Sequence, residues 1–362
     1  MISSSALLRR LGLGFGLAIA IATIPMTASA QQVIKLTAMD GYPERALWVK
    51  EFINFYMPEV DKRLAKTGKY KIEWQKAFGG QIVKPRGEFD GLKNGLGDIA
   101  IITTVFYEDK LPLNNVPYFT PFSSGNPAVV AKIIDDLAVK FPEFRKQFED
   151  YNQVVLTNFS TIDTYGVFAS KPIAKLDDLK GMKLDAAGPN ALYIKPVGAV
   201  GVSGSLVSYY NDIKTGVADG AIIWMEAAIT FKIGEVAPHY LKSNFGTGVN
   251  KAITVNADVW KKLPDEVKAA LKEVAPLYRN HVAKVTLDIA DKSTKAFLAK
   301  GGKIVELSAA EQRKWAMALP NIAQDWAEAQ EKRGLPGKKF LTAYMDALRA
   351  AGEKPVRNWD KE

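Results

Sequence analysis

Asp185, in the run LKGMKLDAAGPN at residues 179–190, is the residue whose charge would most restrict what this chain can bind. A carboxylate there could pair with a cationic ligand, share a hard metal ion with Glu226, or cap a turn. Aromatic side chains near the ends of other expected strands could face the same ligand. These are Tyr42, Phe106, Tyr107, Tyr165 and Trp224.

The rest of the composition argues against catalysis. The chain has no cysteine, which excludes thiol chemistry, and its two histidines are His239 and His281. Neither HExxH nor GxSxG occurs, so neither a zinc site nor a Ser-His-Asp triad is indicated. The net charge of +9 is spread along the chain, which favours a basic soluble surface over a nucleic-acid partner. We therefore expect a binding protein, not an enzyme.

The first 30 residues are typical of a secretory signal peptide. Arg9 and Arg10 precede an apolar run at 11–24, and the triplet Ala28-Ser29-Ala30 precedes Gln31. The apolar run is too short to span a bilayer comfortably. We predict cleavage after Ala30, a protein free in the periplasm, and no direct insertion into the membrane.

Strand-like and helical runs alternate along the remaining chain, and the pattern restarts after residue 152. This alternation predicts an α/β fold with mostly parallel sheets. A helical stretch at 264–300 is long enough to bridge two lobes, with Pro276 as a candidate kink. We predict a two-lobe periplasmic-binding-protein clamshell. Its lobe I comprises 31–161 plus about 250–288, and its lobe II comprises 162–249 plus about 289–362.

Several segments together carry a family likeness. They are FGGQIVKPRGEFDGLKNGLGDIAI (78–101), FASKPIAKLDDLKGMKL (168–184), VGAVGV (197–202), YNDIKTGVADG (210–220) and VNADVWKKLPDEVKAAL (255–271). In this order they resemble the solute-binding subunits of tripartite ATP-independent periplasmic (TRAP) transporters, the dicarboxylate-receptor-like family. The resemblance implies a clamshell that encloses a small ligand at its hinge, delivery to membrane permease subunits driven by an ion gradient, and no catalysis.

The chain departs from that family where the ligand carboxylate is normally held. The resemblance implies an arginine where Asp185 stands, a second arginine where Tyr165 stands, and an asparagine where Ile223 stands, next to Trp224. Two like charges about 5 Å apart at an effective dielectric near 20 repel by roughly 3 kcal/mol. That repulsion is worth about two decades of affinity. A bare carboxylate beside Asp185 is therefore disfavoured.

Three interpretations of Asp185 remain open. In the first, it pairs with a small amine or amino alcohol, and Phe106, Tyr107, Tyr165 and Trp224 form an aromatic wall. In the second, Asp185 and Glu226 hold a Na⁺ or Ca²⁺ ion that bridges to an organic acid. In the third, Asp185 is an N-cap or turn residue, and other donors, among them a basic residue not yet located, hold the ligand.

The predicted function is a periplasmic TRAP receptor for a small amine or amino alcohol, or for a metal-bridged organic acid. The alternatives are a receptor for an ordinary carboxylate and a ligand sensor for a signalling partner. Tyr42 is expected to line the cleft opening. We expect a monomer and no cofactor other than the bridging ion of the second interpretation.

Overall fold

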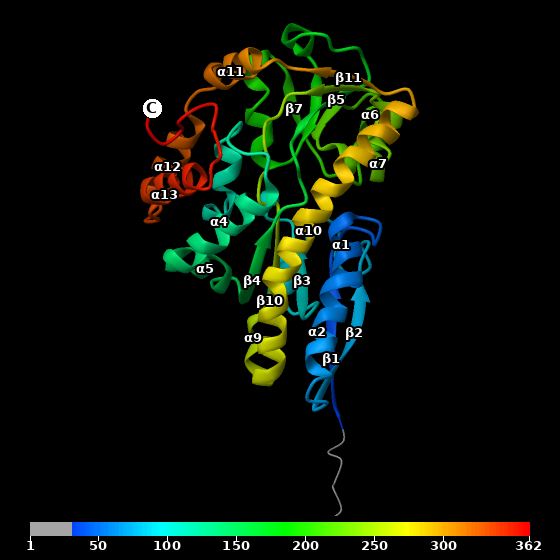
Figure 1. The fold of residues 1–362 in the computed structure, drawn as a ribbon, viewed down its shortest axis with the longest axis vertical. Coiled ribbons are helices and arrows are strands. Elements are labelled where there is room, and N and C mark those ends of the chain that lie inside the picture. Colours follow the sequence, from blue (N-terminus) through cyan, green and yellow to red (C-terminus); the bar gives the residue numbers. More distant parts are fainter. Residues whose placement is uncertain (1–30) are drawn as a thin grey trace, which may run out of the picture.

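The chain forms two β-sheets that are linked by a long helix (Figure 1). This computed structural model describes residues 31–362, and the predicted signal peptide at 1–30 lies outside the described residues. The sheets have the strand orders β2-β1-β3-β10-β4 and β11-β9-β5-β8-β6-β7. We call the parts built on the five-stranded and the six-stranded sheet the first and the second lobe.

The strands of the first lobe are β1 (Gln32–Met39), β2 (Tyr70–Ala77), β3 (Ile99–Ile102), β4 (Gln153–Phe159) and β10 (Lys251–Asn256). Those of the second lobe are β5 (Gly166–Ala169), β6 (Lys183–Ala186), β7 (Val200–Ser203), β8 (Gly220–Ile223), β9 (His239–Lys242) and β11 (Lys303–Glu306). The central strands β3, β5 and β8 are buried along their whole length, as their apolar sequences predict. β10 is buried along its whole length too, although it contains Lys251, Thr254 and Asn256.

Helices cover the sheets and connect their strands. In the first half of the chain they are α1 (Leu47–Glu51), the π-helix η1 (Phe52–Tyr56), α2 (Met57–Leu64), α3 (Glu88–Lys93), α4 (Pro127–Lys140) and α5 (Pro142–Glu149). In the second half they are α6 (Tyr209–Lys214), α7 (Met225–Thr230), α8 (Ile233–Val236), α9 (Ala257–Lys262), α10 (Asp265–Ala299), α11 (Ala309–Ala318), α12 (Ile322–Lys332) and α13 (Gly337–Ala350). Short 3₁₀ turns include η2 (Thr104–Phe106), η3 (Leu113–Phe119) and η5 (Gly188–Leu192).

Both sheets are mixed, whereas the sequence predicted mostly parallel pairing. β10 runs antiparallel to β3 and β4, and β5 runs antiparallel to β8 and β9. These are strands by which the chain enters one sheet from the other: β5 follows β4, and β10 follows β9. No crossover helix turns the chain round at these two points, so each strand enters against the direction of its neighbours. The predicted α/β fold with two lobes is confirmed.

The predicted bridging helix is α10, which runs for 35 residues without a break at Pro276. It packs against α2, β4 and α4 of the first lobe and against α7 of the second lobe (Figure 1). Its buried side chains lie between Val267 and Thr286 and then at Ser293 and Phe297, which leaves residues 287–292 without a buried side chain. Within residues 31–362, no helix combines the length and apolar character needed to cross a membrane.

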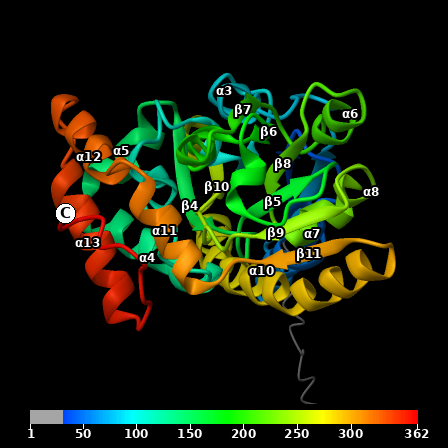
Figure 2. The ribbon, with the colours of Figure 1, turned by 90° about the horizontal axis from the view of Figure 1, so that it is seen from above.

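The tail helices α12 and α13 lie beside α4, at one side of the molecule (Figures 1 and 2). They also contact η3. Both α4 and η3 belong to the range predicted for lobe I, whereas the tail itself was assigned to lobe II. The lobe boundaries therefore stay a prediction.

Candidate functional site

A small cavity lies where strand ends of both sheets meet. Some of its lining residues directly follow the strands β1, β3, β6 and β8. Others lie at or just before the first residue of β5 and β10, which run in the opposite direction. This is the edge at which open α/β sheets present ligand groups. The first lobe supplies Tyr42, Thr103, Val105, Phe106, Asn250 and Lys251, and the second lobe supplies Tyr165, Ala187, Leu206, Tyr209, Ile222, Ile223 and Trp224.

The cavity has a volume of about 20 Å³, which is room for about one water molecule. A ligand of even six heavy atoms therefore needs the lobes to separate or the side chains to rotate. Because residues of both lobes line it, such a ligand would contact both lobes only when they are close together.

Four of the seven predicted site residues line this cavity. They are Tyr42, Phe106, Tyr165 and Trp224. Tyr107, Asp185 and Glu226 do not belong to the lining and lie behind it. That the four bind a ligand stays a prediction.

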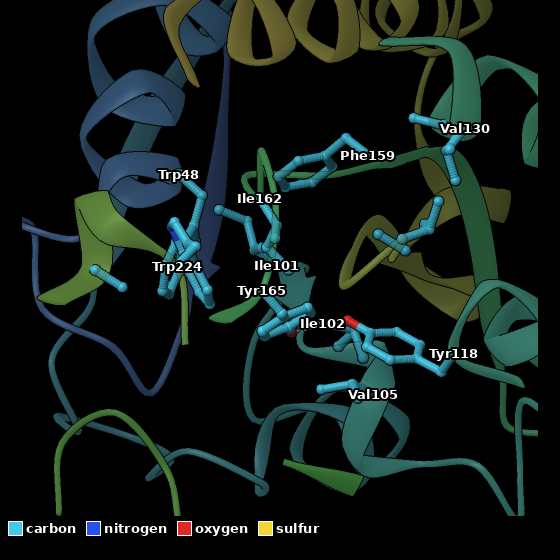
Figure 3. Packing of buried hydrophobic residues seen from close by; sticks show 14 of the residues in the cluster. Trp48, Ile101, Ile102, Val105, Tyr118, Val130, Phe159, Ile162, Tyr165 and Trp224 are labelled. Carbon is cyan, nitrogen blue, oxygen red and sulfur yellow. Dashed lines mark hydrogen bonds between the residues drawn. The ribbon is translucent and has the colours of Figure 1, made fainter. Parts of the chain in front are cut away.

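The aromatic residues of the cavity hold one another in place. The rings of Tyr165 and Trp224 meet edge to face with centroids 5.8 Å apart. The Tyr118 and Tyr165 hydroxyls lie 3.3 Å apart, and Figure 3 shows these two rings pointing toward each other. Tyr42 contacts Trp48 edge to face at 5.0 Å. The wall is thus a packed set of rings with fixed orientation.

Lys251 is the site residue that the sequence did not reveal. It is buried at the first position of β10, its Nζ donates a hydrogen bond to Thr103 Oγ1 at 3.2 Å, and it lies 4.0 Å from the centre of the Trp48 ring. Of the described residues that line the cavity, Lys251 alone carries a charge. A lysine directly before the β-prone residues AITV (252–255) was the one available signal. It is a candidate for the unlocated basic residue of the third interpretation, whose role in binding stays a prediction.

Two buried carboxyl groups accompany Lys251. Asp40, after β1, accepts hydrogen bonds from the Tyr42 N–H and from Trp48 Nε1, both at 2.8 Å. Glu88, the first residue of α3, accepts from the Gly41 N–H at 3.3 Å. Burial raises the pKa of Asp40 to about 7 and that of Glu88 to about 8, and burial lowers the pKa of Lys251 to about 8.

Asp185 is buried in β6 and its carboxylate contacts the back of the site. Neither carboxylate oxygen has a hydrogen-bond partner. A Cβ placed on Gly204 would lie 3.0 Å from Asp185 Oδ1 and 2.8 Å from Tyr209 Cε1, so Asp185 sits next to the tyrosine that lines the cavity. Burial, and to a smaller extent the charge of Asp212, raises the pKa of Asp185 to about 7. Because it caps no turn, the N-cap part of the third interpretation is wrong.

Tyr107 and Glu226 support the site from outside. The Tyr107 hydroxyl lies 3.4 Å from Glu88 Oε2. Glu226 accepts hydrogen bonds from Trp224 Nε1 at 3.2 Å and from Thr230 Oγ1 at 2.5 Å, which orients the indole of the cavity wall. In the described part of the chain, no three His, Cys, Asp or Glu side chains are grouped to hold a metal ion. The bridging ion of the second interpretation stays an untested prediction.

Polar and close contacts join the lobes beside the cavity. Arg86 Nη2 donates to Gly204 O at 2.8 Å and to Ser203 Oγ at 3.2 Å, and its guanidinium stacks on Phe106 at 4.3 Å. Gly188 of η5 comes so near the first lobe that a Cβ there would lie 2.4 Å from Val105 O. These contacts define the closed arrangement of the lobes.

Comparison with known proteins gives the family. The chain matches DctP, the bacterial extracellular solute-binding protein family 7, over residues 56–330. It is 23% identical over 314 residues to a solute-binding protein of Albidiferax ferrireducens, which covers 82% of this chain and 88% of that protein.

Solved structures share the fold. A TRAP solute-binding protein from Rhodoferax ferrireducens, in complex with copurified benzoate, is similar with a TM-score of 0.77 and 18% identity over 88% of this chain and 98% of that one. A TRAP periplasmic solute-binding protein from Bordetella bronchiseptica, with bound (R)- and (S)-mandelate, is similar with a TM-score of 0.76 and 20% identity over 88% and 99%. The lobes, the bridging helix and the matched range lead to one conclusion: this chain belongs to family 7 of the bacterial extracellular solute-binding proteins.

Proposed function

We propose that this protein is the periplasmic receptor of a TRAP transporter and that it captures a small organic acid as its anion. The observation that carries the proposal is Lys251, a buried cation at the wall of the cavity between the lobes. Benzoate and mandelate, the ligands of the two similar structures, are carboxylates and agree with this charge.

Lys251 is placed to meet a carboxylate. Its ammonium has one hydrogen-bond partner, Thr103, and otherwise lies over the face of Trp48. A carboxylate about 4 Å from it, at an effective dielectric near 20, would gain roughly 4 kcal/mol of attraction. That energy corresponds to about three decades of affinity. This attraction to Lys251 is larger than the repulsion from Asp185, which lies behind Tyr209 and outside the lining. Asp40 and Glu88 oppose it to the extent that they are ionised.

The remaining wall suits an apolar, flat body on the acid. Phe106, Tyr165, Tyr209 and Trp224 present rings, and Leu206 adds an aliphatic side chain. Rings of this kind stack on an aromatic acid or cover a short hydrocarbon chain. The ligand class favoured is therefore a small monocarboxylate with an apolar group.

Closure of the lobes is the proposed capture step. A ligand that contacts Lys251 of the first lobe and Trp224 of the second favours the closed state, because only that state provides both contacts. The Arg86 contacts to Ser203 and Gly204 stabilise the same state. Closure also removes water around Lys251, which strengthens its attraction for the anion.

The predicted amine ligand is less well supported than the alternative of an ordinary carboxylate. The amine interpretation needed Asp185 as a wall of the site, and Asp185 does not line the cavity. Its burial also favours the neutral carboxyl group, which attracts a cation weakly.

Matched acid and amine pairs test the ligand class. Isothermal titration calorimetry would compare benzoate with benzylamine, and mandelate with 2-amino-1-phenylethanol, each with and without Ca²⁺ or Na⁺. We expect the acids to bind and the amines not to, with no effect of Ca²⁺. Binding of the amines alone would reject the proposal, and acid binding that needs an added ion would restore the second interpretation.

Replacement of Lys251 tests the residue. Lys251→Met should weaken acid binding by at least a hundredfold, whereas Lys69→Met, at an exposed position, should leave it unchanged. Equal affinity of both variants would show that Lys251 does not hold the ligand. Uptake of the labelled acid by cells with and without the gene would show whether the receptor serves a permease.

A further inference from the structure

Asp40, Glu88 and Lys251 form a buried ionic cluster on the first-lobe side of the cavity. They come from the end of β1, the start of α3 and the start of β10, and the side chains are inaccessible to solvent. Lys251 is the member that reaches the cavity, while Asp40 and Glu88 lie behind it. The charge of Lys251 raises the ionisation tendency of both carboxyl groups, and their charges in turn favour the protonated lysine.

The cluster has one acid too many for its one base. With all three groups ionised, the buried net charge is −1, and the Asp40 and Glu88 carboxylates repel each other. Hydrogen bonds from N–H groups stabilise the ionised form of each carboxyl group. Asp40 accepts from the Tyr42 N–H and from Trp48 Nε1, and Glu88 accepts from the Gly41 N–H. These donors moderate the cost of burial without removing it. Near neutral pH the two carboxyl groups therefore share a proton, and they titrate as a pair.

An anion beside Lys251 changes this balance. At a pH where the carboxyl pair has lost its shared proton, the anion adds a second negative charge to the buried site, so the cluster plus ligand would carry −2 around a single cation. Protonation of one carboxyl group returns the site to −1. The ligand thus favours the proton and, by reciprocity, the proton favours the ligand.

Resting on the proposed function, we infer that the protein takes up a proton together with its anionic ligand, and that the Asp40–Glu88 pair holds this proton.

The tyrosines near the cluster do not supply the same effect. Tyr42, Tyr107, Tyr209 and Tyr278 face it from the surrounding elements, and burial raises the pKa of each phenol, so all four stay neutral. Beyond Tyr278 lies the Glu51–His281 pair, whose His281 Nε2 and Glu51 Oε2 are 2.8 Å apart. That pair joins α1 to α10. It and Asp185, which lies behind Tyr209 and whose pKa burial raises to about 7, are the sources to be excluded by experiment.

Calorimetry counts the proton directly. Benzoate is the probe, because it stays ionised throughout the range. Titrations at pH 8 in phosphate and in Tris, which differ in ionisation enthalpy, give the number of protons exchanged. We expect uptake of about 0.5–1 proton per benzoate, and a dissociation constant that rises by about three- to tenfold per pH unit above pH 8. Deprotonation of Lys251, whose pKa is about 8, would give a similar rise, so the variants below assign the proton.

Substitutions of single acidic residues show which group binds the proton. Glu88→Gln and Asp40→Asn should each reduce the uptake by at least half and flatten the pH dependence. Glu51→Gln and Asp185→Asn should leave the uptake as it is in the wild type. If one cluster variant fails to fold, the other assigns the proton, and the wild-type proton number still decides whether a proton is taken up at all.

The outcomes separate the two proposals. Benzoate binding with no proton exchange and a flat pH profile overturns the proton uptake and leaves the receptor for organic acids standing. Uptake that persists in both cluster variants places the proton on Lys251 or elsewhere and overturns the role of the Asp40–Glu88 pair. Failure of every carboxylate to bind overturns the proposed function, and the proton uptake with it.

Discussion

Asp185→Asn is expected to stabilise this protein at alkaline pH. Burial and Asp212 raise the pKa of Asp185 from 3.8 to about 7, and neither oxygen receives a hydrogen bond. A difference of about 3 units corresponds to about 4 kcal/mol in the free energy of ionisation. Some relaxation and hydration of the ionised group lowers this figure, so we expect a gain of about 2–4 kcal/mol at pH 8.

The sign follows from proton linkage. Between pH 3.8 and about 7 the folded state keeps the Asp185 proton that the unfolded chain has lost, so wild-type stability falls as the pH rises through this range. Asparagine does not ionise, and its advantage over the wild type grows from near zero at pH 4 to its full value above pH 7. Each kcal/mol corresponds to roughly 2 °C in melting temperature for a chain of this size.

Urea unfolding followed by circular dichroism at pH 4, 6 and 8 measures the effect. Asp177→Asn, at an exposed position outside the site, is the matched control and should show no such trend. A stability difference between Asp185→Asn and the wild type that is the same at pH 4 and pH 8 would refute the reasoning. So would a loss of stability at pH 8.

Three further predictions concern two contacts between the lobes and one hydrogen bond within the second lobe. Arg86→Gln removes charged hydrogen bonds between the lobes and should speed ligand dissociation by about tenfold in stopped-flow measurements. Gly188→Ala places a methyl group 2.4 Å from Val105 O, so it should hinder closure and weaken binding at least tenfold by calorimetry. Asp219 accepts a hydrogen bond from the Lys183 N–H, which holds its pKa below the usual value. Asp219→Asn should therefore cost about 1 kcal/mol at pH 7, and this cost should shrink as the pH falls below 3.8 in urea unfolding.

Controls distinguish these effects from general damage. Gly216→Ala also places an alanine at a positive φ, 78°, but into open space, so its affinity should stay near that of the wild type. If Gly188→Ala and Gly216→Ala weaken binding equally, closure is not what the methyl group obstructs. An unchanged dissociation rate in Arg86→Gln would show that its contacts do not hold the lobes. A loss at pH 3 as large as at pH 7 would remove the electrostatic explanation for Asp219.

The elements of the fold were predictable because local apolar patterns specify them. The buried run IAII became β3, and the long helical pattern after Pro264 became α10. Strand direction was not predictable in the same way, because it depends on where the chain passes between lobes. The sequences of β5 and β10 resemble those of other buried strands. Their pairing is antiparallel because the strand before each one belongs to the other sheet, from which the chain arrives without a crossover helix.

The site was predictable only in its aromatic part. Phe106 and Trp224 follow strand ends, and strand ends converge at one edge. Lys251 was missed because a lysine at the start of a strand resembles an ordinary exposed end, and its burial depends on packing against Trp48, far away in the chain. Asp185 was recognised as unusual, but its distance from the cavity is set by Tyr209, whose position no local pattern gives.

The thinly packed turns of α10, residues 287–292, have a mechanical consequence. Before them, Tyr278 is held by Phe52 and Phe159 of the first lobe, and after them Phe297 is held by Phe168 of the second. A helix flexes most cheaply where no side chain must leave its packing, so lobe opening should bend α10 in these turns rather than at Pro276. Opening and closing of the lobes would then change the curvature of α10. The distance between two spin labels, one at each end of α10, would measure that change.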